Sequence, residues 1–343
     1  MITPARFDAI VRGYPNLRIA LLGDFCLDRY LEIDPARQER SIETGLPVHN
    51  VVRVRPQPGG AGTILNNLDA LGIGTIFPIG FAGEDGEGFE LVTCLRRTQG
   101  VQLSHFIQTP LRRTFTYCKP LLMHRSRAPE ELSRLDTKNW TPTPDGLSVR
   151  FTQSLCELAQ SCQAMAVLDQ VDLPDTGVVT EAVRASLGVL ARQYPQLLIT
   201  ADSRQGLKKF PPLTFKMNAA ELAAFTGEDM GHNLDRLKTA ACDIARCNGR
   251  AVFITLAEQG MIGALPDGEA RHVPALPVRG EIDVVGAGDA VTANLVATQA
   301  AGATLVETLE MAVAAASVVI HKLGTTGSAS VGEIRERLFD LPR

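Results

Sequence analysis

Asp283-Val284-Val285-Gly286-Ala287-Gly288-Asp289-Ala290 lies late in the chain and leads directly into an Ala- and Val-rich segment with helical character. A strand that breaks into Gly-X-Gly and then opens a helix leaves several backbone N–H groups without partners. The positive end of the helix dipole adds to them and makes an anion site. Asp289 puts a carboxylate beside that site. A carboxylate there opposes simple anion binding but suits a base that takes a proton from an attacking hydroxyl. The stretch therefore predicts a phosphoryl-transfer centre.

Bulk composition limits the possible partners and surroundings. The chain has 343 residues, of which 45% are hydrophobic, and its net charge is −4. An acidic balance argues against nucleic acid or an anionic membrane as the main partner, so we expect a small-molecule substrate. The seven cysteines are scattered and contain no C-x-x-C pair, which indicates reduced thiols in a cytoplasm and no zinc site. We also expect no signal peptide and no membrane span.

Apolar runs rich in β-branched residues alternate with segments of helical spacing. Near-continuous apolar strands between helices are typical of a parallel sheet covered on both faces. We therefore expect an α/β fold with a doubly wound, mostly parallel sheet. The expected strands are 18–23, 75–80, 164–168, 197–201 and 251–256, and the expected helices are 60–71, 86–100, 176–194 and 234–248.

Two stretches, 31–58 and 104–122, alternate polar and apolar residues with no helix inside them. We predict that they form a small β-sheet that projects from the main body as a lid. The large domain would then comprise 1–30, 59–103 and 123–343. The alternative is a pair of ordinary edge hairpins. A lid with one apolar face could pair with that of a second subunit, which favours a homodimer.

Two further motifs lie where an open α/β sheet binds its ligands. Gly59 and Gly60 precede a helix that carries Asn67, and paired glycines allow a substrate to approach the backbone closely. Asp24 and Asp28 follow the first strand, and two carboxylates at that edge suit hydrogen bonds to sugar hydroxyls. A tight turn at the glycines, and an Asx turn with a solvated charge at the aspartates, are the alternatives.

Together these motifs resemble the ribokinase-like (PfkB) sugar kinases over nearly the whole chain. The Gly-Gly segment is similar to the N-terminal signature of that family, and 283–289 is similar to its D-T-x-G-A-G-D signature. Within the family, Leu22-Gly23-Asp24-Phe25-Cys26-Leu27-Asp28-Arg29-Tyr30 resembles most the heptose-7-phosphate kinase branch of ADP-heptose synthesis. His321-Lys322-Leu323-Gly324-Thr325 supports the same branch.

The resemblance implies an ATP-dependent kinase that uses Mg²⁺, with a monovalent cation such as K⁺ near 283–289. It implies Asp289 as the catalytic base, an anion hole at Gly286, Ala287 and Gly288, and Arg204 near the transferred phosphoryl group. Glu221 would orient water around Mg²⁺, with Asn218 beside it. The nucleotide-side positions are Asp202, Asn218, Glu221, Thr255 and Gly260, and the sugar-side positions are Asp24, Asp28, Gly59, Gly60, Thr63 and Asn67.

Several positions depart from the family pattern. Thr63 replaces an asparagine, Val284 replaces the threonine of the late signature, and Val313 replaces an asparagine of the nucleotide side. Asp172 stands where heptose kinases carry a lysine in a D-Y-G-K-G-like run. The acceptor could therefore be a heptose 7-phosphate, another sugar or a nucleoside. Candidate ligands for a substrate phosphate are Arg112, Arg113, Arg125, Arg127, Lys208 and Lys209.

Two other functions are compatible with parts of the sequence. A dinucleotide-dependent dehydrogenase could use Gly286-Ala287-Gly288 as its glycine turn, but that turn normally opens the first βαβ unit, and only 55 residues follow Gly288. A non-catalytic nucleotide- or sugar-binding regulator could have kept the fold. The presence of Asp289, Asn218 and Glu221 favours the kinase over both.

Overall fold

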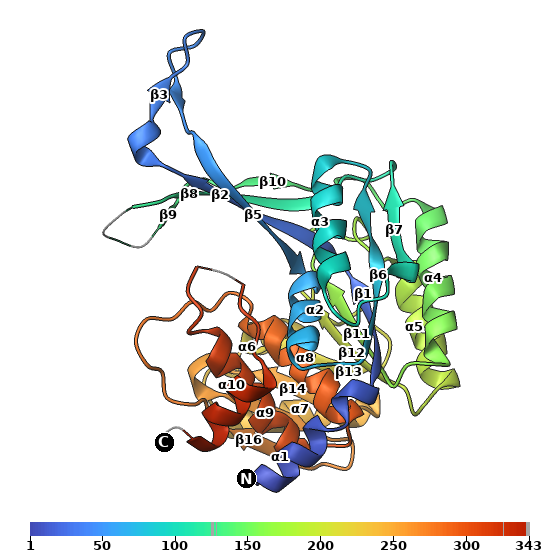
Figure 1. Ribbon diagram of the computed structural model, residues 1–343. Helices are drawn as coiled ribbons and strands as arrows, with labels where there is room; N and C mark the ends of the chain where they lie inside the picture. The colour runs from blue at the N-terminus through green and yellow to red at the C-terminus, as the bar shows by residue number, and fades with distance from the viewer. Residues whose placement is uncertain (125–126, 128, 325, 341–343) are drawn as a thin grey trace.

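The computed structural model describes residues 1–124, 127, 129–324 and 326–340. Its centre is a nine-stranded sheet in the order β16-β15-β14-β13-β12-β11-β1-β6-β7 (Figure 1). The pairs from β14 to β7 are parallel, and β15 and β16 add antiparallel strands at one edge. The strands are β1 (Arg18–Gly23), β6 (Thr75–Gly83), β7 (Phe106–Thr109), β11 (Ala164–Asp169), β12 (Leu198–Ser203), β13 (Thr214–Asn218), β14 (Val252–Thr255), β15 (Met261–Ala264) and β16 (Ala270–Val273).

Helices cover both faces of this sheet because its central strands are buried on both sides. All six residues of β11 are buried, as are five of the six in β1. One apolar core lies under α4, α5 and α7, and the other lies under α1, α2, α3, α8 and α9. The helices are α1 (Pro4–Val11), α2 (Ala61–Ala70), α3 (Gly86–Arg97), α4 (Asp145–Ala159), α5 (Glu181–Gln193), α6 (Ala219–Thr226), α7 (Leu234–Asn248), α8 (Ala287–Ala300), α9 (Leu305–Val319) and α10 (Val331–Arg335).

The expected α/β architecture is confirmed. All five expected strands and all four expected helices are present, and most of their ends differ by only a few residues. The largest difference lies at α5, which begins at Glu181 instead of 176. Thr180 accepts a hydrogen bond from the N–H of Val183 and so caps the helix, and the preceding residues form a loop.

A second, smaller sheet has the order β10-β8-β2-β5, with β9 paired to β8. Its strands are β2 (Phe25–Ile33), β5 (Val51–Gly60), β8 (Phe115–Leu122), β9 (Glu130–Glu131) and β10 (Leu135–Thr137). This sheet overhangs one end of the large one, and a short hairpin of β3 (Glu39–Arg40) and β4 (Pro47–Val48) extends from it (Figure 1).

The small sheet was expected, but its predicted boundaries were wrong in three places. It begins at Phe25, directly after β1, instead of at residue 31. Part of 104–122 belongs elsewhere: β7 pairs with β6 in the large sheet, and Phe106 packs edge-on against Phe25. The segment after 122 returns to the small sheet through β9 and β10. These strands are two and three residues long, which is too short for their alternation to be recognised.

The helices of the described residues include none that is both long and apolar enough to cross a lipid bilayer. All seven cysteines are free.

Candidate active site

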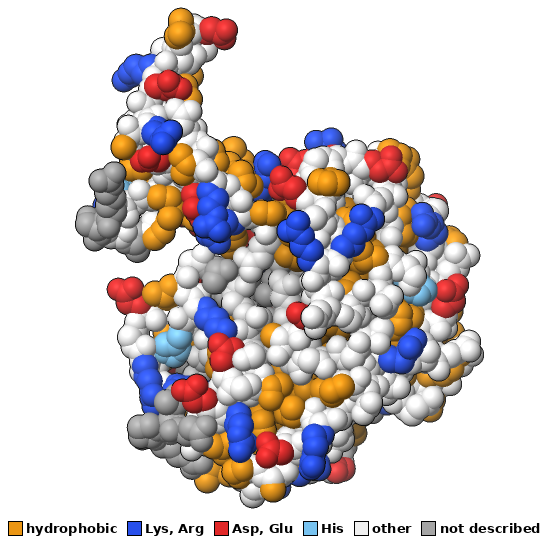
Figure 2. Space-filling model, in the orientation of Figure 1, with side chains coloured by type: hydrophobic (Ala, Val, Ile, Leu, Met, Phe, Trp, Pro, Cys, Tyr) orange, Lys and Arg blue, Asp and Glu red, His pale blue; other side chains and the backbone are white. Residues whose placement is uncertain are grey.

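The predicted site residues gather where the parallel strands of the large sheet end. Asp169, Ser203 and Asn218 close β11, β12 and β13, and the register aligns Asp169 with Ser203 and Asn218 with Thr255. Ligands of open α/β sheets bind outside this carboxyl edge. The small sheet overhangs the same edge, and the space-filling view shows a notch between it and the body (Figure 2). The site therefore lies between the two sheets.

The glycine elbow at 286–288 opens α8 as the sequence predicts. Gly286 is the N-cap residue with a φ of 84°, a left-handed conformation that favours glycine. The first helical bond runs from the N–H of Ala290 to the carbonyl of Gly286, and the N–H of Ala287 closes a turn onto Val284. The N–H groups of Gly288 and Asp289 have no acceptor within the helix, because they lie in its first turn. The elbow therefore offers two main-chain donors and a helix dipole to an anion.

Asp289 lies in the first turn of α8, partly buried, beside other carboxylates. Burial raises the pKa of this carboxyl to about 7, and the negative charges of Asp202 and Asp28 add to the effect. Lys216 and Arg204 oppose it. A carboxyl with a pKa near neutrality can both accept and release a proton at physiological pH, as a general base must. Asp289 also lies close enough to Arg204 of the body and to Asp28 of the small sheet, across the notch, to interact with their charges.

Lys216 is a candidate site residue that the sequence analysis did not single out. It lies in the buried strand β13, and its ammonium forms a 2.7 Å ion pair with Asp202 on β12. A Cβ placed on Gly288 would lie 3.3 Å from Lys216 Nζ, so the ammonium sits against the elbow. Burial alone would lower the pKa of Lys216, but Asp202, with smaller contributions from Glu221 and Asp289, raises it above its ordinary value. A fixed positive charge therefore adjoins the anion site. A lysine inside an apolar strand was the signal that could have revealed it.

Asp202 itself has a different position from the one expected. It is buried, and its Oδ2 accepts hydrogen bonds from Lys216 and from the Thr292 hydroxyl at 3.2 Å. The structure therefore shows Asp202 holding Lys216 and α8 in place, and it does not line the adjoining cavity.

Asn218 and Glu221 form the cap of α6. The N–H of Glu221 donates to Asn218 Oδ1 at 2.9 Å, and the N–H of Asn218 donates to Glu221 Oε2 at 2.7 Å, which is a capping box. Burial and the charge of Asp202 raise the pKa of Glu221, against the effect of Asn218 N–H. Crowded carboxylates of this kind attract a hard cation such as Mg²⁺, which prefers oxygen ligands and keeps several waters. The described residues contain no ready cluster of three metal ligands, so water and phosphate oxygens would have to complete the shell.

A cavity of about 1090 Å³ opens beside the elbow and extends toward α9. Gly288, Lys216 and Asn218 line its polar end. Most of the rest is apolar, formed by residues such as Leu256, Met261, Leu276, Val291, Val313 and Ile320. Polar residues also line it away from the elbow, among them Glu228, His232 and Glu258. Its volume and its polar lining at the elbow suit a nucleotide whose phosphates lie at the elbow.

Besides Asn218, two further predicted nucleotide-side positions line this cavity. Thr255 ends β14, and Gly260 forms the tight turn into β15 with a φ of 88°. A Cβ on Gly260 would lie 2.1 Å from the Val273 carbonyl oxygen, so no other residue fits there. Val313, where the family carries an asparagine, also lines the cavity and offers only apolar contact.

The inner face of the small sheet provides the opposite wall of the site. Strand alternation and register bring Cys26, Asp28, Tyr30, Tyr117 and Lys119 to one face, which we call the acceptor face. Lys119 Nζ lies 3.3 Å from Asp28 Oδ1 and 4.9 Å from the centre of the Tyr30 ring. A carboxylate and an ammonium side by side, next to two aromatic rings, are typical of a site for a polyhydroxylated ligand.

Gly59 is required for this arrangement, because a Cβ there would lie 2.9 Å from the carboxylate of Asp28. Gly60 is the N-cap of α2 with a φ of 57°. Thr63 is buried near the elbow, and its hydroxyl has no hydrogen-bond partner among the described residues. A Cβ on Gly286 would lie 3.6 Å from the Thr63 methyl, so α2 and the elbow are in close contact.

Asn67 was expected on the sugar side, but the structure gives its amide another partner. Its Nδ2 donates to the Thr63 carbonyl at 2.9 Å, and its Oδ1 accepts from the N–H of Ala329 at 3.0 Å. Asn67 thus attaches the late segment 326–329 to α2. From that segment the Thr326 hydroxyl donates to Asp28 Oδ2 at 3.1 Å. Thr326, which the sequence analysis missed, therefore orients Asp28. Thr325 lies outside the described residues.

Asp24 also differs from expectation. It is 1% exposed, and its two carboxylate oxygens accept from the N–H groups of Gln170 at 2.8 Å and Val178 at 2.7 Å. Both oxygens thus hold the ends of the loop 170–178, and the burial leaves no surface for a sugar hydroxyl. Asp28 is also buried, at 5% exposed, but it lies on the acceptor face beside Lys119 and Thr326. Asp24 lies in the link between β1 and β2, where its carboxylate meets the loop 170–178, whereas Asp28 lies within β2 on the face of Tyr30.

Arg204 follows β12 and lies half-exposed at the rim of the site. Its Nη1 is 3.5 Å from Asp172 Oδ1, and Lys138 Nζ is 2.6 Å from the other oxygen of the same carboxylate. Its charge also acts on Asp289, Glu221 and Cys26. The charge of Arg204 therefore reaches both the elbow and the acceptor face.

The candidate phosphate ligands are mostly elsewhere. Arg112 is buried among carbonyl oxygens, Arg113 pairs with Asp85, and Arg127 pairs with Glu130. Lys208 and Lys209 are exposed, and Arg125 lies outside the described residues. Cations that adjoin the acceptor face include Lys119, Lys138 and Arg204, together with Arg134 over the Tyr117 ring at 4.8 Å and Arg55 over the Tyr30 ring at 4.7 Å.

Comparisons with known proteins agree with this geometry. The profile of pfkB family carbohydrate kinases matches residues 25–331. The chain is 28% identical to the Bifunctional protein HldE of Bradyrhizobium sp. (strain ORS 278), over 97% of this chain and 66% of that protein. It is 30% identical to the protein of the same name from Magnetococcus marinus, over 96% of this chain and 66% of that protein. The chain thus spans just under two thirds of the length of these relatives.

Solved structures share the fold. Phosphofructokinase-2 from Escherichia coli, in complex with substrates and products, superposes with a TM-score of 0.74 at 19% identity, covering 95% of this chain and 100% of that one. Ribokinase from Arabidopsis thaliana, complexed with ribose and ATP, gives a TM-score of 0.68 at 16% identity, covering 94% and 99%.

Proposed function

The chain belongs to the pfkB family of carbohydrate kinases, which are ATP-dependent and use a divalent metal, and from this premise we propose that its acceptor is a sugar phosphate. Heptose 7-phosphate is the first candidate. Three features support this choice: the similarity to the HldE proteins, the heptose-kinase-like stretch 22–30, and the cations Lys119, Arg134, Lys138 and Arg204 around the acceptor face.

In the proposed reaction, Asp289 accepts the proton of the acceptor hydroxyl as that oxygen attacks the γ-phosphate. The observation that carries this role is the position of Asp289, which lies in the elbow and interacts with Asp28 across the notch. The N–H groups of Gly288 and Asp289, together with Lys216 and Arg204, stabilise the negative charge that spreads over the transferred group. Glu221, beside Asn218, would hold Mg²⁺ through water, and the ion would supply further charge neutralisation.

Asp28 would hold the sugar. Lys119 and Thr326 fix its carboxylate, so that it accepts hydrogen bonds from hydroxyls in one orientation. Gly59 leaves room beside it, and Thr63 offers a buried hydroxyl near the elbow. Closure of the small sheet over the body would exclude water and suppress hydrolysis of ATP.

One observation favours a second candidate, an acceptor without a phosphate. Lys119 and Lys138 each have a carboxylate within 3.3 Å or less, Asp28 and Asp172 respectively, which neutralises much of their charge. A neutral sugar would leave these pairs intact, whereas a phosphate would have to compete with the carboxylates. Ribokinase- or fructokinase-like activity on another sugar or a nucleoside therefore stays a defined alternative.

A direct comparison of acceptors tests both candidates, the sugar phosphate and the acceptor without a phosphate. We expect the highest kcat/KM with heptose 7-phosphate in a panel with free heptose, fructose 6-phosphate, fructose, ribose and adenosine. A higher kcat/KM for the unphosphorylated member of each pair would reject the sugar phosphate in favour of the second candidate. ADP formation without an acceptor, at the same rate as with every acceptor, would reject both.

Three properties of the working protein are also proposed. A monovalent cation such as K⁺ would bind near 283–289, and equal activity in sodium and potassium buffers would argue against it. The protein would act in the cytoplasm, where ATP and reduced thiols occur. A homodimer would form through the small sheet, since Ile42, Leu46, Val52 and Val54 are exposed there. A monomeric mass by light scattering would argue against the dimer.

A further inference from the structure

Two connections join the strands β8 and β10 of the small sheet to the body. Residues 110–114 lead from β7 into β8, and residues 138–144 lead from β10 to α4. We refer to them as the ingoing and outgoing connections. Asn139 of the outgoing connection bonds the backbone of Arg113 in both directions, to the N–H at 3.0 Å and to the carbonyl at 2.8 Å. The two connections are therefore tied side by side.

Arg112 of the ingoing connection is 5% exposed, and its guanidinium donates to three neutral oxygens. Its Nη1 donates to Thr141 Oγ1 at 3.2 Å and to the Pro142 carbonyl at 3.3 Å, both on the outgoing connection. Its Nη2 donates to the Thr176 carbonyl at 2.6 Å, and its Nε has no partner among the described residues. Burying a guanidinium beside neutral oxygens is costly. Its planar fork, however, can hold three chain segments at fixed angles, which no neutral side chain does.

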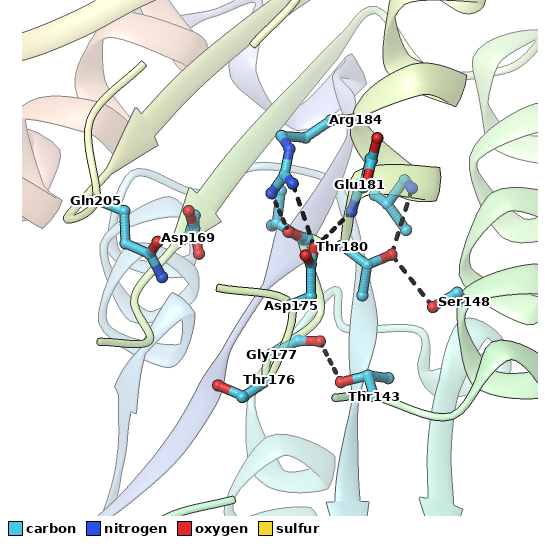
Figure 3. A network of polar contacts seen from close by, with 12 residues as sticks. Thr143, Ser148, Asp169, Asp175, Thr176, Gly177, Thr180, Glu181, Arg184 and Gln205 are labelled. Carbon is cyan, nitrogen blue, oxygen red and sulfur yellow. Dashed lines mark hydrogen bonds and ion pairs between the residues drawn. The ribbon is translucent and has the colours of Figure 1, made fainter. Parts of the chain in front are cut away.

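Thr176 belongs to the loop 170–178, which lies between the body and the acceptor face. We call it the acceptor loop, because its Asp172 pairs with Arg204 at the rim of the site. The outgoing connection holds the same loop: Thr143 Oγ1 donates to the Gly177 carbonyl at 2.6 Å, and the Thr143 N–H donates to the Asp175 carbonyl at 2.8 Å. Figure 3 shows the bond from Thr143 to Gly177 beside Thr176.

The acceptor loop is itself firmly attached to the large domain. The carboxylate of Asp175 accepts from the N–H of Glu181 at 2.7 Å and from Arg184 at 3.2 Å, both on α5 (Figure 3). Asp175 has a φ of 59°, which is unusual for a residue other than glycine and is held by these bonds. Gln205, next to Arg204, donates to the Val171 carbonyl at 3.1 Å. The loop is thus attached to the body. Arg112, Thr143 and the ion pair of Lys138 with Asp172 link it to the two connections of the small sheet.

From this arrangement we infer that Arg112 is a positioning residue that couples the small sheet to the acceptor loop, so that the acceptor face and Arg204 keep one relative position. It touches neither the proposed acceptor nor the nucleotide cavity. Its effect reaches the site through Thr176 and Asp172 of the loop and through Lys138 of the outgoing connection. The inference rests on the proposed function only in naming the acceptor side as the side affected.

The test compares Arg112→Lys with Arg113→Lys. Lysine keeps the charge at 112 but cannot bond three oxygens in a plane. Arg113 is the matched control because it is the next residue in the chain. Its side chain is 66% exposed, and its ion pair with Asp85 is long, at 3.6 Å. We expect R112K to lower kcat/KM for the acceptor about tenfold or more, with the KM for ATP unchanged within about twofold. ADP formed per acceptor phosphorylated should rise, because an uncoupled lid admits water. R113K should match wild type.

Hydrogen exchange gives a readout that needs no substrate. In R112K we expect faster exchange in peptides covering 138–143 and 170–178 together, with the elbow at 286–290 unaffected. The single tryptophan, Trp140, lies on the outgoing connection, so its fluorescence should shift in R112K as well. Should R112K be poorly folded, Thr141→Val removes one of the three acceptors at an exposed position and should give the same changes at smaller size.

Unchanged hydrogen exchange in both segments in R112K and T141V would overturn the inference. Equal losses of kcat/KM for ATP and for the acceptor would also overturn it. If wild type phosphorylates no sugar in the panel, the proposed function fails. In that case the hydrogen-exchange experiment would still test whether Arg112 couples the small sheet to the acceptor loop.

Discussion

Replacing Asp289 with asparagine should make the protein inactive and, at neutral pH, more stable. Burial and the charges of Asp202 and Asp28 raise the pKa of this carboxyl from 3.8 to about 7. The folded chain therefore holds a proton at pH values where the unfolded chain has lost it. The contribution of this carboxyl to the free energy of unfolding is fully present below pH 4 and is lost as the pH rises to about 7. The difference between the folded and unfolded pKa values corresponds to roughly 4 kcal/mol of lost stability above pH 7. The D289N variant should regain a large part of that stability.

The activity should change in the opposite direction. Without a base, phosphoryl transfer should fall about 10²–10⁴-fold, and the remaining rate should no longer increase with pH toward 7. Binding of ATP, measured by calorimetry, should be kept or improved, because one negative charge has left the anion site. Urea unfolding at pH 4, 6 and 8 measures the stability of both proteins. The gain in D289N should be small at pH 4 and largest at pH 8.

Two outcomes would refute this reasoning. Turnover of D289N within a few-fold of wild type would remove the catalytic role. A stability difference that does not depend on pH would show that the carboxyl of Asp289 does not titrate near neutrality in the folded protein. Asp267→Asn, in the exposed turn before β16, is the control that should change neither quantity.

Three further predictions concern the buried charges around the elbow and the acceptor loop. Lys216→Met should lower the free energy of unfolding by about 3 kcal/mol, because it strands Asp202, and should lower kcat about 100-fold. Adding Asp202→Asn should restore stability but not kcat, and recovery of both would assign Lys216 a structural role only. Glu221→Gln should raise the Mg²⁺ concentration for half-maximal rate about tenfold, and an unchanged titration would contradict a metal role. Asp169 is buried beside Asp24, and its pKa is raised to about 7. Asp169→Asn should therefore reduce the loss of stability between pH 5 and 8, measured by urea unfolding. An unchanged slope of the free energy of unfolding against pH would contradict that pKa.

The large domain could be predicted from the sequence because its signals are local. Each central strand is a short apolar run, and most helices carry a cap or a glycine at their ends, such as Asn218 and Gly227 of α6. The glycine elbow was recognisable for the same reason, since a strand, two glycines and a helix follow one another directly. The positive φ of Gly286 is the local property that the motif encodes.

The small sheet and the partners of buried polar groups depend on contacts between distant residues. Strand β8 runs parallel to β2 although more than 80 residues separate them, and no local pattern specifies that pairing. Asp24 and Asp28 illustrate the same limit. Both follow the first strand, but one carboxylate meets main-chain N–H groups of the acceptor loop and the other meets Lys119. The sequence shows two candidate carboxylates, and only the fold distinguishes them.

The charges at the elbow explain why the nucleotide should enter with its metal. Asp28, Asp202, Asp289 and Glu221 bring four carboxyl groups to the site, and Lys216 with Arg204 and Lys119 bring three cations. The proton on Asp289 balances this set when no ligand is bound. A polyphosphate without a metal would add negative charge, raise the pKa of Asp289 further and keep the base protonated. A divalent cation near Glu221 reverses that shift, so the same ion that neutralises the phosphates also allows Asp289 to act as a base.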